Sequence, residues 1–213
     1  MKHLLIIGAR GFGREIYWMA QNTAAFINHV YDIKGFLDDK RDALDGLNGE
    51  FLPIIGTVEE YDVQPDDVFF CALGNPVYRK KYAEIIESKG GEFITLIDPL
   101  AIVNPNAIIS PGCSIGPYVI VSDNVKIGKH TVIHSFCTLG HDVVVGDYVS
   151  MESYVFLGGY SRVGELSVMH TKSSIIPHKS IGNNVEVGIN SAVMRNIGND
   201  CSLLGTPAIK IEI

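Results

Sequence analysis

The chain of 213 residues lacks the features that mark membrane and secreted proteins. No stretch approaches the roughly 20 consecutive apolar residues of a membrane-spanning helix. The residues from Met1 to His3 run directly into an apolar strand pattern without the composition of a secretory signal. Only four cysteines are present, and no pair has the spacing of metal ligands. We therefore expect reduced core thiols, no metal and a cytoplasmic location.

Positive charge is also scarce. The 17 lysines and arginines are outnumbered by 24 acidic residues, which gives a net charge of -7 at pH 7. The basic side chains cluster only at Arg79-Lys80-Lys81. Proteins that bind nucleic acid or an anionic membrane surface need a larger basic patch, so the composition argues against both partners. The hydrophobic content of 46% supplies a core, and the length suits two small domains.

A six-residue repeat dominates the second half of the chain. Every sixth residue from Val103 to Val193 is aliphatic or Met, a small or β-branched residue usually stands two positions earlier, and glycine often follows. This period fits neither a helix nor simple strand alternation, so each unit is one short strand and a turn. We expect the glycines where the backbone turns sharply. An ordinary β-sandwich would need longer strands without a fixed period. Three units make a triangular coil of eighteen residues, and stacked coils predict a parallel β-helix.

The first hundred residues alternate strand and helix patterns. Strand patterns occupy or end at Lys2 to Ile7, Phe36 to Asp39, Phe69 to Gly74 and Phe93 to Ile97, and helix patterns occupy Arg14 to Ala25 and Val77 to Lys89. This alternation predicts a small parallel sheet with crossover helices. The proline of Asp98-Pro99 ends the last strand, so we place the domain boundary there, with domains at 1–98 and 99–213.

A glycine-rich turn follows the first strand, with the spacing Gly8-x-x-Gly11-x-Gly13. Glycines at a strand-to-helix turn let a phosphate approach the N–H groups at the positive end of a helix. The spacing differs from the dinucleotide-binding pattern G-x-G-x-x-G, which weakens the prediction of a dinucleotide site. The same glycines are also consistent with a tight turn that binds no ligand. The acidic pair Asp38-Asp39, thirty residues on, is suited to a ribose or base of a nucleotide.

Five motifs in this order resemble a family, the hexapeptide-repeat sugar acyltransferases that include bacterial UDP-4-amino-sugar N-acetyltransferases and sialic acid O-acetyltransferases. The motifs are Ile7-Gly8-Ala9-Arg10-Gly11-Phe12-Gly13-Arg14-Glu15, Phe36-Leu37-Asp38-Asp39, Ala72-Leu73-Gly74-Asn75, Leu139-Gly140-His141-Asp142 and Gly205-Thr206-Pro207-Ala208. The resemblance covers essentially the whole chain. It implies an α/β Rossmann-like nucleotide-sugar-binding domain followed by an all-β left-handed parallel β-helix with the acyltransferase site.

The resemblance also implies partners and contact residues. It implies a homotrimer that binds acetyl-CoA in the groove between neighbouring prisms and holds a nucleotide-sugar on the N-terminal domain. The residues expected at the cofactor are Gly158, Gly159 and Ser150. The residues expected at the nucleotide-sugar are Gly8, Arg10, Gly11, Phe12, Gly13, Asp38, Asp39, Gly74 and Asn75.

His141 is the histidine with the strongest catalytic pattern. It lies two residues past an inward aliphatic residue, so we expect its side chain to leave the prism, and Asp142 follows directly to orient the ring. One coil later, Gly158 lies over Gly140 and Gly159 follows, which leaves room for a thioester and exposes a backbone N–H to its carbonyl oxygen. The resemblance makes His141 the base, Asp142 its acidic companion and Gly159 a cofactor contact.

Other histidines fit structural roles. His134 and His170 occupy equivalent positions two coils apart with Glu152 between them, a pattern typical of a hydrogen-bonded column or trimer contact. We expect His130 to be solvated in a turn. In some relatives a second histidine contacts the cofactor nine residues after the base, where this chain has Ser150. Phe12 likewise replaces a histidine of the glycine turn.

The favoured function is acetyl-CoA-dependent acetylation of a nucleotide-linked amino sugar by direct transfer, with a histidine general base. O-acetylation of sialic acid or another glycan sugar is the alternative within the same class. A non-catalytic β-helix binding module is a second class, against which the His141-Asp142 pair argues. A nucleotide-dependent oxidoreductase is a third, and the glycine spacing counts against it.

Overall fold

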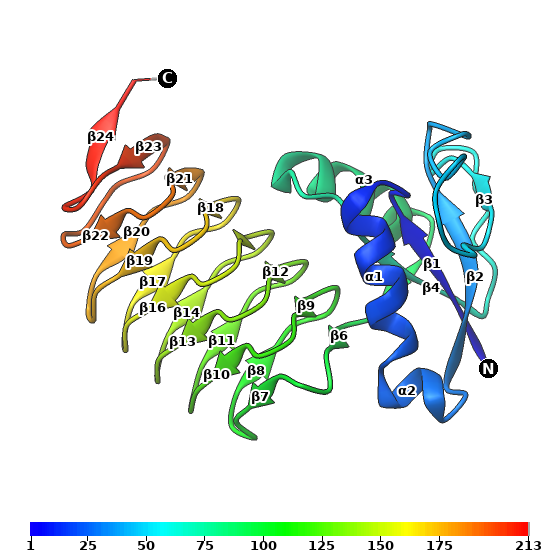
Figure 1. Ribbon diagram of the computed structural model, residues 1–213, viewed down its shortest axis with the longest axis horizontal. Coiled ribbons are helices and arrows are strands. Elements are labelled where there is room, and N and C mark those ends of the chain that lie inside the picture. The colour runs from blue at the N-terminus through cyan, green and yellow to red at the C-terminus, as the bar shows by residue number, and fades with distance from the viewer. Residues whose placement is uncertain (213) are drawn as a thin grey trace. The chain divides into compact units, whose positions relative to one another are not determined.

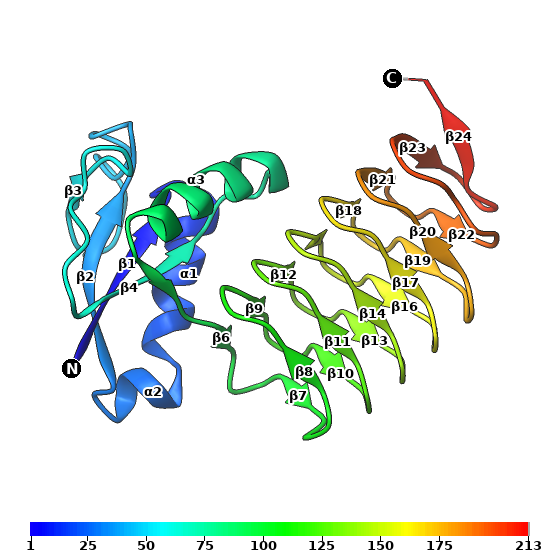
Figure 2. The same cartoon turned by 180° about the vertical axis from the view of Figure 1, so that it is seen from behind.

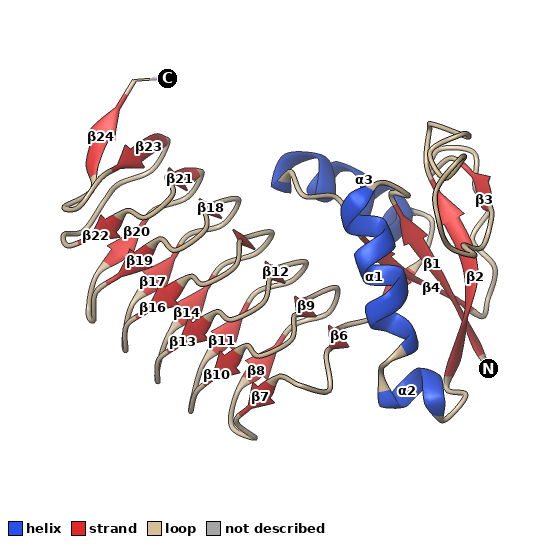
Figure 3. Cartoon of the chain, viewed as in Figure 1, coloured by secondary structure: helices blue, strands red, loops and turns tan. Residues whose placement is uncertain are grey.

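The computed structural model describes residues 1–212 and divides into two compact units, Met1–Pro99 and Leu100–Ile213. Within these described residues, helices occur only in the first unit, and the second consists of short strands and turns (Figure 3). None of the helices in residues 1–212 is long and apolar enough to span a membrane.

The N-terminal unit is an open parallel sheet with the strand order β3-β2-β1-β4-β5. Its strands are β1 (Lys2–Ile7), β2 (Tyr31–Leu37), β3 (Ile54–Gly56), β4 (Asp67–Cys71) and β5 (Glu92–Phe93). Its helices are α1 (Gly11–Gln21), α2 (Ala24–Ile27) and α3 (Pro76–Ser88), and β6 (Leu96–Ile97) ends the unit. A parallel sheet brings the carboxyl ends of β1, β2 and β4 to one edge, where such folds bind ligands.

Both faces of this sheet are buried, because successive side chains of a strand point to opposite sides. Leu4 and Ile6 pack on the side of α1, together with Ile16 of that helix. Leu5 and Ile7 pack on the other side, with Ile86 of α3. Helix α1 lies in front of the sheet in Figure 1, and α3 lies in front in the reverse view of Figure 2.

The helix expected from Arg14 to Ala25 is divided in two. Helix α1 begins three residues earlier at Gly11 and ends at Gln21. Thr23 then interrupts it, because its hydroxyl accepts from the Phe26 N–H at 3.2 Å and caps the short α2. The strand expected from Phe93 to Ile97 is likewise two short strands, β5 and β6. Strand β3 was not predicted, because three residues are too few to show a strand pattern.

The second unit is a parallel β-helix whose strands pair with those one coil away (Figure 1). Ile120 of β10, for example, pairs with Thr138 of β13, which lies eighteen residues later. One sheet contains β7 (Ile102–Val103), β10 (Ile120–Val121), β13 (Thr138–Leu139), β16 (Phe156–Leu157), β19 (Ser174–Ile175) and β22 (Ala192–Val193). A second contains β8 (Ile108–Ile109), β11 (Lys126–Ile127), β14 (Val144–Val145), β17 (Arg162–Val163) and β20 (Ser180–Ile181). The third includes β9 (Ser114–Ile115), β12 (Val132–Ile133), β15 (Ser150–Met151), β18 (Val168–Met169), β21 (Val185–Val187), β23 (Cys201–Leu204) and the antiparallel β24 (Ile209–Ile211).

Both inward positions of the repeat are buried as predicted. Leu139 and Cys137 of one unit, for example, are each fully buried in the core of the β-helix. The interior of a coil has no room for charged side chains. Small and aliphatic residues therefore recur at the inward positions of every six-residue unit.

The repeat glycines do not occupy the sharp turns, contrary to the expectation above. The left-handed backbone positions lie two residues further on and hold other residues, such as Asp142 with φ 61° and Tyr160 with φ 62°. Glycine is needed instead where one coil touches the next, since a Cβ on Gly140 would lie 2.8 Å from the Gly159 nitrogen. The histidine expected to be solvated, His130, is 1% exposed and stacks on Tyr148 at 5.0 Å.

Candidate active site

His141 and Asp142 form a hydrogen-bonded pair at one corner of the β-helix. His141 follows β13, and its Nδ1 lies 2.8 Å from Oδ2 of Asp142. The His141 side chain is 59% exposed and that of Asp142 29%, so the imidazole leaves the prism while most of its partner is covered. The exposed ring is therefore accessible to a substrate on the outside of the coil.

Hydrogen bonds to Asp142 determine which ring nitrogen of His141 carries the proton. The bond with His141, followed by one from the Asn124 side chain, lowers the pKa of the Asp142 carboxyl. An ionised carboxylate only accepts, so Nδ1 of His141 carries the hydrogen that it donates. Nε2 of the neutral ring then has a free lone pair, which is the state that a general base requires.

Gly159 lies directly against the imidazole of His141. A Cβ on Gly159 would stand 2.9 Å from Nε2 and 3.0 Å from Cε1. The space that the missing side chain leaves is thus filled by the ring, whereas we expected it to stay open for a thioester. The Gly159 carbonyl accepts from the His178 N–H at 3.0 Å, while its own N–H donates to no acceptor within residues 1–212. That N–H is free for an external oxygen beside Nε2.

Three further side chains occur at eighteen-residue intervals along the same corner. Asn124 donates to Oδ1 of Asp142 at 2.7 Å. Tyr160 packs edge-on against the His141 ring at 5.0 Å and stacks on His178 at 4.7 Å. The sequence analysis gave none of the three a role in the site, although each lies a multiple of eighteen residues from Asp142.

The two other residues expected at the cofactor lie apart from the imidazole. Gly158 is buried, and a Cβ on it would stand 2.5 Å from the Pro177 nitrogen, so it is required for the coils to stack. Ser150 lies in β15, which belongs to a different sheet from β13, and is 7% exposed. A single chain does not bring Ser150 and His141 together.

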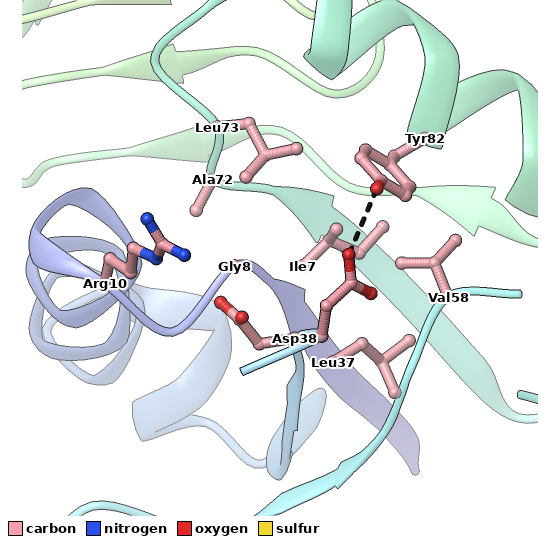
Figure 4. Close-up of a pocket in the computed structure, with 10 residues that line it drawn as sticks. Ile7, Gly8, Arg10, Leu37, Asp38, Val58, Ala72, Leu73 and Tyr82 are labelled. Carbon is pink, nitrogen blue, oxygen red and sulfur yellow. Dashed lines mark hydrogen bonds between the residues drawn. The ribbon is translucent and has the colours of Figure 1, made fainter. Parts of the chain in front are cut away.

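The N-terminal unit contains a cavity of about 200 Å³ at the carboxyl edge of its sheet (Figure 4). Four of the residues expected to bind the nucleotide-sugar line it, namely Gly8, Arg10, Asp38 and Asp39. Arg10 and Tyr82 stand on opposite sides of Gly8 in Figure 4. The other lining residues are Ile7, Leu37, Val58, Ala72, Leu73 and Tyr82, whose mostly apolar side chains suit a flat ring.

Asp38 lines this cavity and connects the two segments that form its edge. Its Oδ2 accepts from the Ala9 N–H and its Oδ1 from the Lys40 N–H, both at 2.8 Å. The first bond joins the end of β2 to the glycine turn after β1. Gly8 has φ 95°, and a Cβ there would stand 3.0 Å from the Ala72 oxygen, so the strand ends approach closely only because position 8 is glycine.

Tyr82 brings α3 to the wall of the same cavity. Its hydroxyl donates to Oδ2 of Asp39 at 3.3 Å. Burial, with the nearby Asp39 charge, raises the pKa of Tyr82, so the phenol stays protonated and a donor at neutral pH. No sequence motif marked Tyr82, because it reaches the site from a helix face forty-three residues beyond Asp39.

The other residues expected at the nucleotide-sugar do not line the cavity. Phe12 packs into the core and contacts Phe70 edge-on at 6.5 Å. Gly11 is the first residue of α1, and a Cβ on it would contact nothing within 4 Å. A Cβ on Gly13, in contrast, would overlap the Gly8 carbonyl. Asn75 caps α3 by accepting from the Val77 N–H at 2.9 Å, and the Gly74 carbonyl accepts from Arg79 at 3.2 Å.

The expected ladder of His170 and Glu152 is a hydrogen-bonded network. Nδ1 of His170 lies 3.1 Å from Glu152, and Nε2 lies 2.7 Å from Glu186. Glu152 also accepts from the Thr171 N–H at 2.9 Å. Both ring nitrogens are thus engaged, which favours a structural role. Within residues 1–212 no group of three histidine, cysteine or acidic side chains is arranged to hold a metal ion.

A small Rossmann-like sheet followed by a parallel β-helix with a surface histidine–carboxylate pair is the arrangement that the sequence resemblance led us to expect. Two family models match in the corresponding places. Residues 3–99 match the PglD N-terminal domain, and residues 124–159 match the bacterial transferase hexapeptide (six repeats). Both parts of the chain are therefore similar to hexapeptide-repeat sugar acyltransferases.

Known proteins resemble the chain over different lengths. A UDP-N-acetylbacillosamine N-acetyltransferase of Bacillus subtilis (strain 168) is 33% identical over 115 residues, which are 53% of this chain and 50% of that protein. The chain thus matches about half the length of this curated relative.

Solved structures match the chain from end to end. The acetyltransferase domain of PglB from Neisseria gonorrhoeae FA1090 is 26% identical and superposes with a TM-score of 0.88 over 99% of this chain and 100% of that one. A second structure of that domain is a complex with acetyl coenzyme A and covers 99% of both chains. A mutant GDP-perosamine N-acetyl transferase from Caulobacter crescentus, with CoA and GDP-perosamine, has a TM-score of 0.88 over 100% and 98% of the two chains, and its 19% identity supports the fold alone.

Proposed function

We propose that this protein transfers the acetyl group of acetyl-CoA directly to the amino group of a nucleotide-linked sugar, with His141 as general base. The observation that carries the proposal is the position of the His141 ring, whose Nδ1 lies 2.8 Å from Oδ2 of Asp142 while Nε2 lies beside Gly159. The relative that acetylates a UDP-linked amino sugar, and the similar domain that binds acetyl coenzyme A, support this choice of substrates.

The residues of the corner divide the chemistry between them. Nε2 of His141 accepts the proton that the acceptor amine loses as its nitrogen bonds to the acetyl carbon. Asp142 stabilises the imidazolium that results, because its carboxylate lies 2.8 Å from Nδ1. The imidazolium then returns the proton to the departing sulfur, which leaves as the CoA thiol. The thioester itself supplies an activated acyl carbon, so no covalent enzyme intermediate is required.

Gly159 completes the proposed site. Its free backbone N–H is suited to stabilise the negative charge that develops on the acetyl oxygen, as an oxyanion donor does. Gly159 has no side chain at the outer surface of this coil, so the pantetheine arm can approach the backbone beside the His141 ring.

The cavity of the N-terminal unit is the proposed nucleotide-sugar site. Gly8, Arg10, Asp38 and Asp39 surround it with a cation, two carboxylates and an open backbone turn. Helix α1 begins at Gly11 with no side-chain cap, so its first N–H groups are suited to a phosphate. Phe12, Gly13, Gly74 and Asn75 would act indirectly, by packing and by shaping the neighbouring loops.

We also propose a cytoplasmic homotrimer with acetyl-CoA bound between neighbouring prisms. Ser150 lies in β15, whereas His141 lies in the turn after β13, a strand of a different sheet, so a second copy is needed to bring two such faces to one cofactor. The four free cysteines agree with a reducing compartment.

The test is release of free CoA by purified protein with acetyl-CoA and a panel of UDP- and GDP-linked 4-amino sugars, alongside free sialic acid. Rapid release with one amino sugar, and a product that resists mild alkali as an amide does, would support N-acetylation. The variant His141→Asn should lower turnover on the order of 10²-fold or more. His29→Asn is the matched control, because His29 is an exposed histidine with φ 56°, which asparagine tolerates well.

Other outcomes assign the protein elsewhere. Release with sialic acid alone and an alkali-labile product would identify an O-acetyltransferase. No release with any acceptor, or turnover by His141→Asn equal to that of the wild type, would contradict the proposal and favour a β-helix binding module. An increase in melting temperature with NADH but not with UDP-sugars would favour a redox enzyme, because a ligand that binds the folded state stabilises it.

A further inference from the structure

We infer that Asn124 is a positioning residue for the catalytic pair, and that it acts by clamping the Asp142 carboxylate so that His141 keeps its reactive tautomer and direction. This inference rests on the proposed function for its effect on turnover. Its effect on the imidazole itself is independent of any substrate.

The clamp is visible in the hydrogen bonds of Asp142. Oδ1 accepts from the Asn124 side-chain amide at 2.7 Å, and Oδ2 pairs with Nδ1 of His141 at 2.8 Å. The backbone N–H of Asp142 donates to the Asp123 carbonyl at 3.0 Å. The backbone and both oxygens of Asp142 are therefore held by separate partners, two of them on the preceding coil. The Tyr160 side chain, on the following coil, also hydrogen-bonds the carboxylate, so Asn124 is the partner that holds it from the other side.

The direction of the imidazole depends on this carboxylate. A carboxyl group turns easily about its last side-chain bond, since such torsions have broad minima. Without the amide, the carboxylate can rotate away from Nδ1 toward water, and the ring can then exchange tautomers and leave its place against Gly159. Because Nε2 lies close to the Gly159 backbone, a small rotation of the ring misdirects the base.

The β-helix uses the same asparagine–aspartate bond elsewhere, without a histidine. Asn184 donates to Oδ1 of Asp200 at 2.9 Å at another corner, and both residues have left-handed backbone angles, as Asn124 and Asp142 do. The two bonds are exposed and should contribute similarly small amounts to stability. Asn184 is therefore a matched control that separates positioning of a base from stabilisation of a corner.

The kinetic test compares Asn124→Gly with Asn184→Gly. Glycine removes the amide without strain at a left-handed position. Asn124→Gly should lower kcat roughly 10- to 100-fold with little change in KM for either substrate, while Asn184→Gly should leave both constants unchanged. Asn124→Asp, which has the same shape but repels Asp142, should lose at least as much. In an Asp142→Ala background, Asn124→Gly should have no further effect, because the clamp then has nothing to hold.

The spectroscopic test needs no substrate. Nitrogen-15 NMR of labelled histidine, with the His141 signals assigned from His141→Asn, should show one tautomer with its hydrogen on Nδ1 in the wild type and in Asn184→Gly. Asn124→Gly should show a mixture of tautomers. A wild-type protein that releases no CoA would contradict the proposed function, whereas this spectrum would still decide the role of Asn124. An unchanged His141 signal in Asn124→Gly, or unchanged kcat in an active enzyme, would overturn the inference.

Discussion

The imidazole of His141 occupies the place where a side chain at Gly159 would stand, since a Cβ there would lie 2.9 Å from Nε2. The two residues are one coil apart, and the contact exists because the coils stack in register. The His141 ring can lie at this point of the surface only because residue 159 has no side chain.

Replacement of Gly159 by alanine should displace the ring with little loss of stability. The backbone at Gly159 accommodates any residue, and a histidine ring is the movable end of a flexible side chain. Turnover in the CoA-release assay should fall roughly tenfold or more, because the base no longer faces its target. Gly198→Ala is the control, since a Cβ there meets nothing within 4 Å. Wild-type turnover in Gly159→Ala would show that the position of the ring is unimportant.

The thiols should differ sharply in reactivity. Burial raises the pKa of both Cys71 and Cys137 to about 12, and Cys113 is also buried. Cys201 is partly exposed. Because the thiolate is the reactive form, a chromogenic disulfide should label one thiol quickly in the native protein and all four after denaturation. Cys201→Ser should abolish the rapid phase, and persistence of that phase would mean that a core cysteine is accessible.

Asp67 should make stability fall in acid. Burial opposes ionisation, but hydrogen bonds from Lys34, the Gln64 N–H and Tyr61 outweigh it and lower the pKa of Asp67. A carboxyl group with a lowered folded-state pKa stabilises the protein above its unfolded value near pH 3.9, and this contribution is lost as pH falls through the folded-state pKa.

The experiment for Asp67 is urea unfolding as a function of pH. Asp67→Asn should lower the free energy of unfolding at pH 7 by roughly 2 to 4 kcal/mol, because it leaves buried donors and Lys34 without their anion. Asp32→Asn, which breaks the exposed pair with His3, should cost less than about 1 kcal/mol. Equal losses for the two variants would contradict the role assigned to the buried network.

His170 should have the opposite pH dependence. Burial alone would lower its pKa, but hydrogen bonds to Glu186 and Glu152 outweigh it and raise the pKa. A histidine with a raised folded-state pKa contributes its full stabilisation below the unfolded value near pH 6.5, and this contribution is lost as pH rises through the folded-state pKa. The difference in free energy of unfolding between wild type and His170→Asn should therefore shrink from pH 6 to pH 9. A difference that is constant with pH would refute this assignment.

The β-helix could be predicted from sequence because each coil repeats the same physical constraint. Its interior accepts only small and aliphatic side chains, so Cys137 and Leu139 have counterparts every six residues. The bounds of the helices and strands in the N-terminal unit were harder to predict. Thr23 ends one helix by capping the next, and β3 is too short for a periodic pattern.

The corner site was partly accessible by the same argument. The structure brings His141, Asp142 and Gly159 together, because stacking translates the chain by one coil every eighteen residues. Asn124 and Tyr160 obey the same rule, because they lie eighteen residues before and after Asp142. No sequence spacing predicts which residues line the cavity of the N-terminal unit, since Val58 and Tyr82 reach it from separate parts of the chain.

The sequence by itself determined the six-residue register, the coil length and the alternation of strands and helices, because these follow from which side chains tolerate burial. Tertiary structure decided which polar atoms meet. The 2.7 Å bond from Asn124 to Asp142, and the contact of the His141 ring with Gly159, depend on side-chain directions at neighbouring coils. A pattern of hydrophobicity specifies what is inside, whereas hydrogen bonds on the surface depend on distances of a few tenths of an ångström that only the folded chain defines.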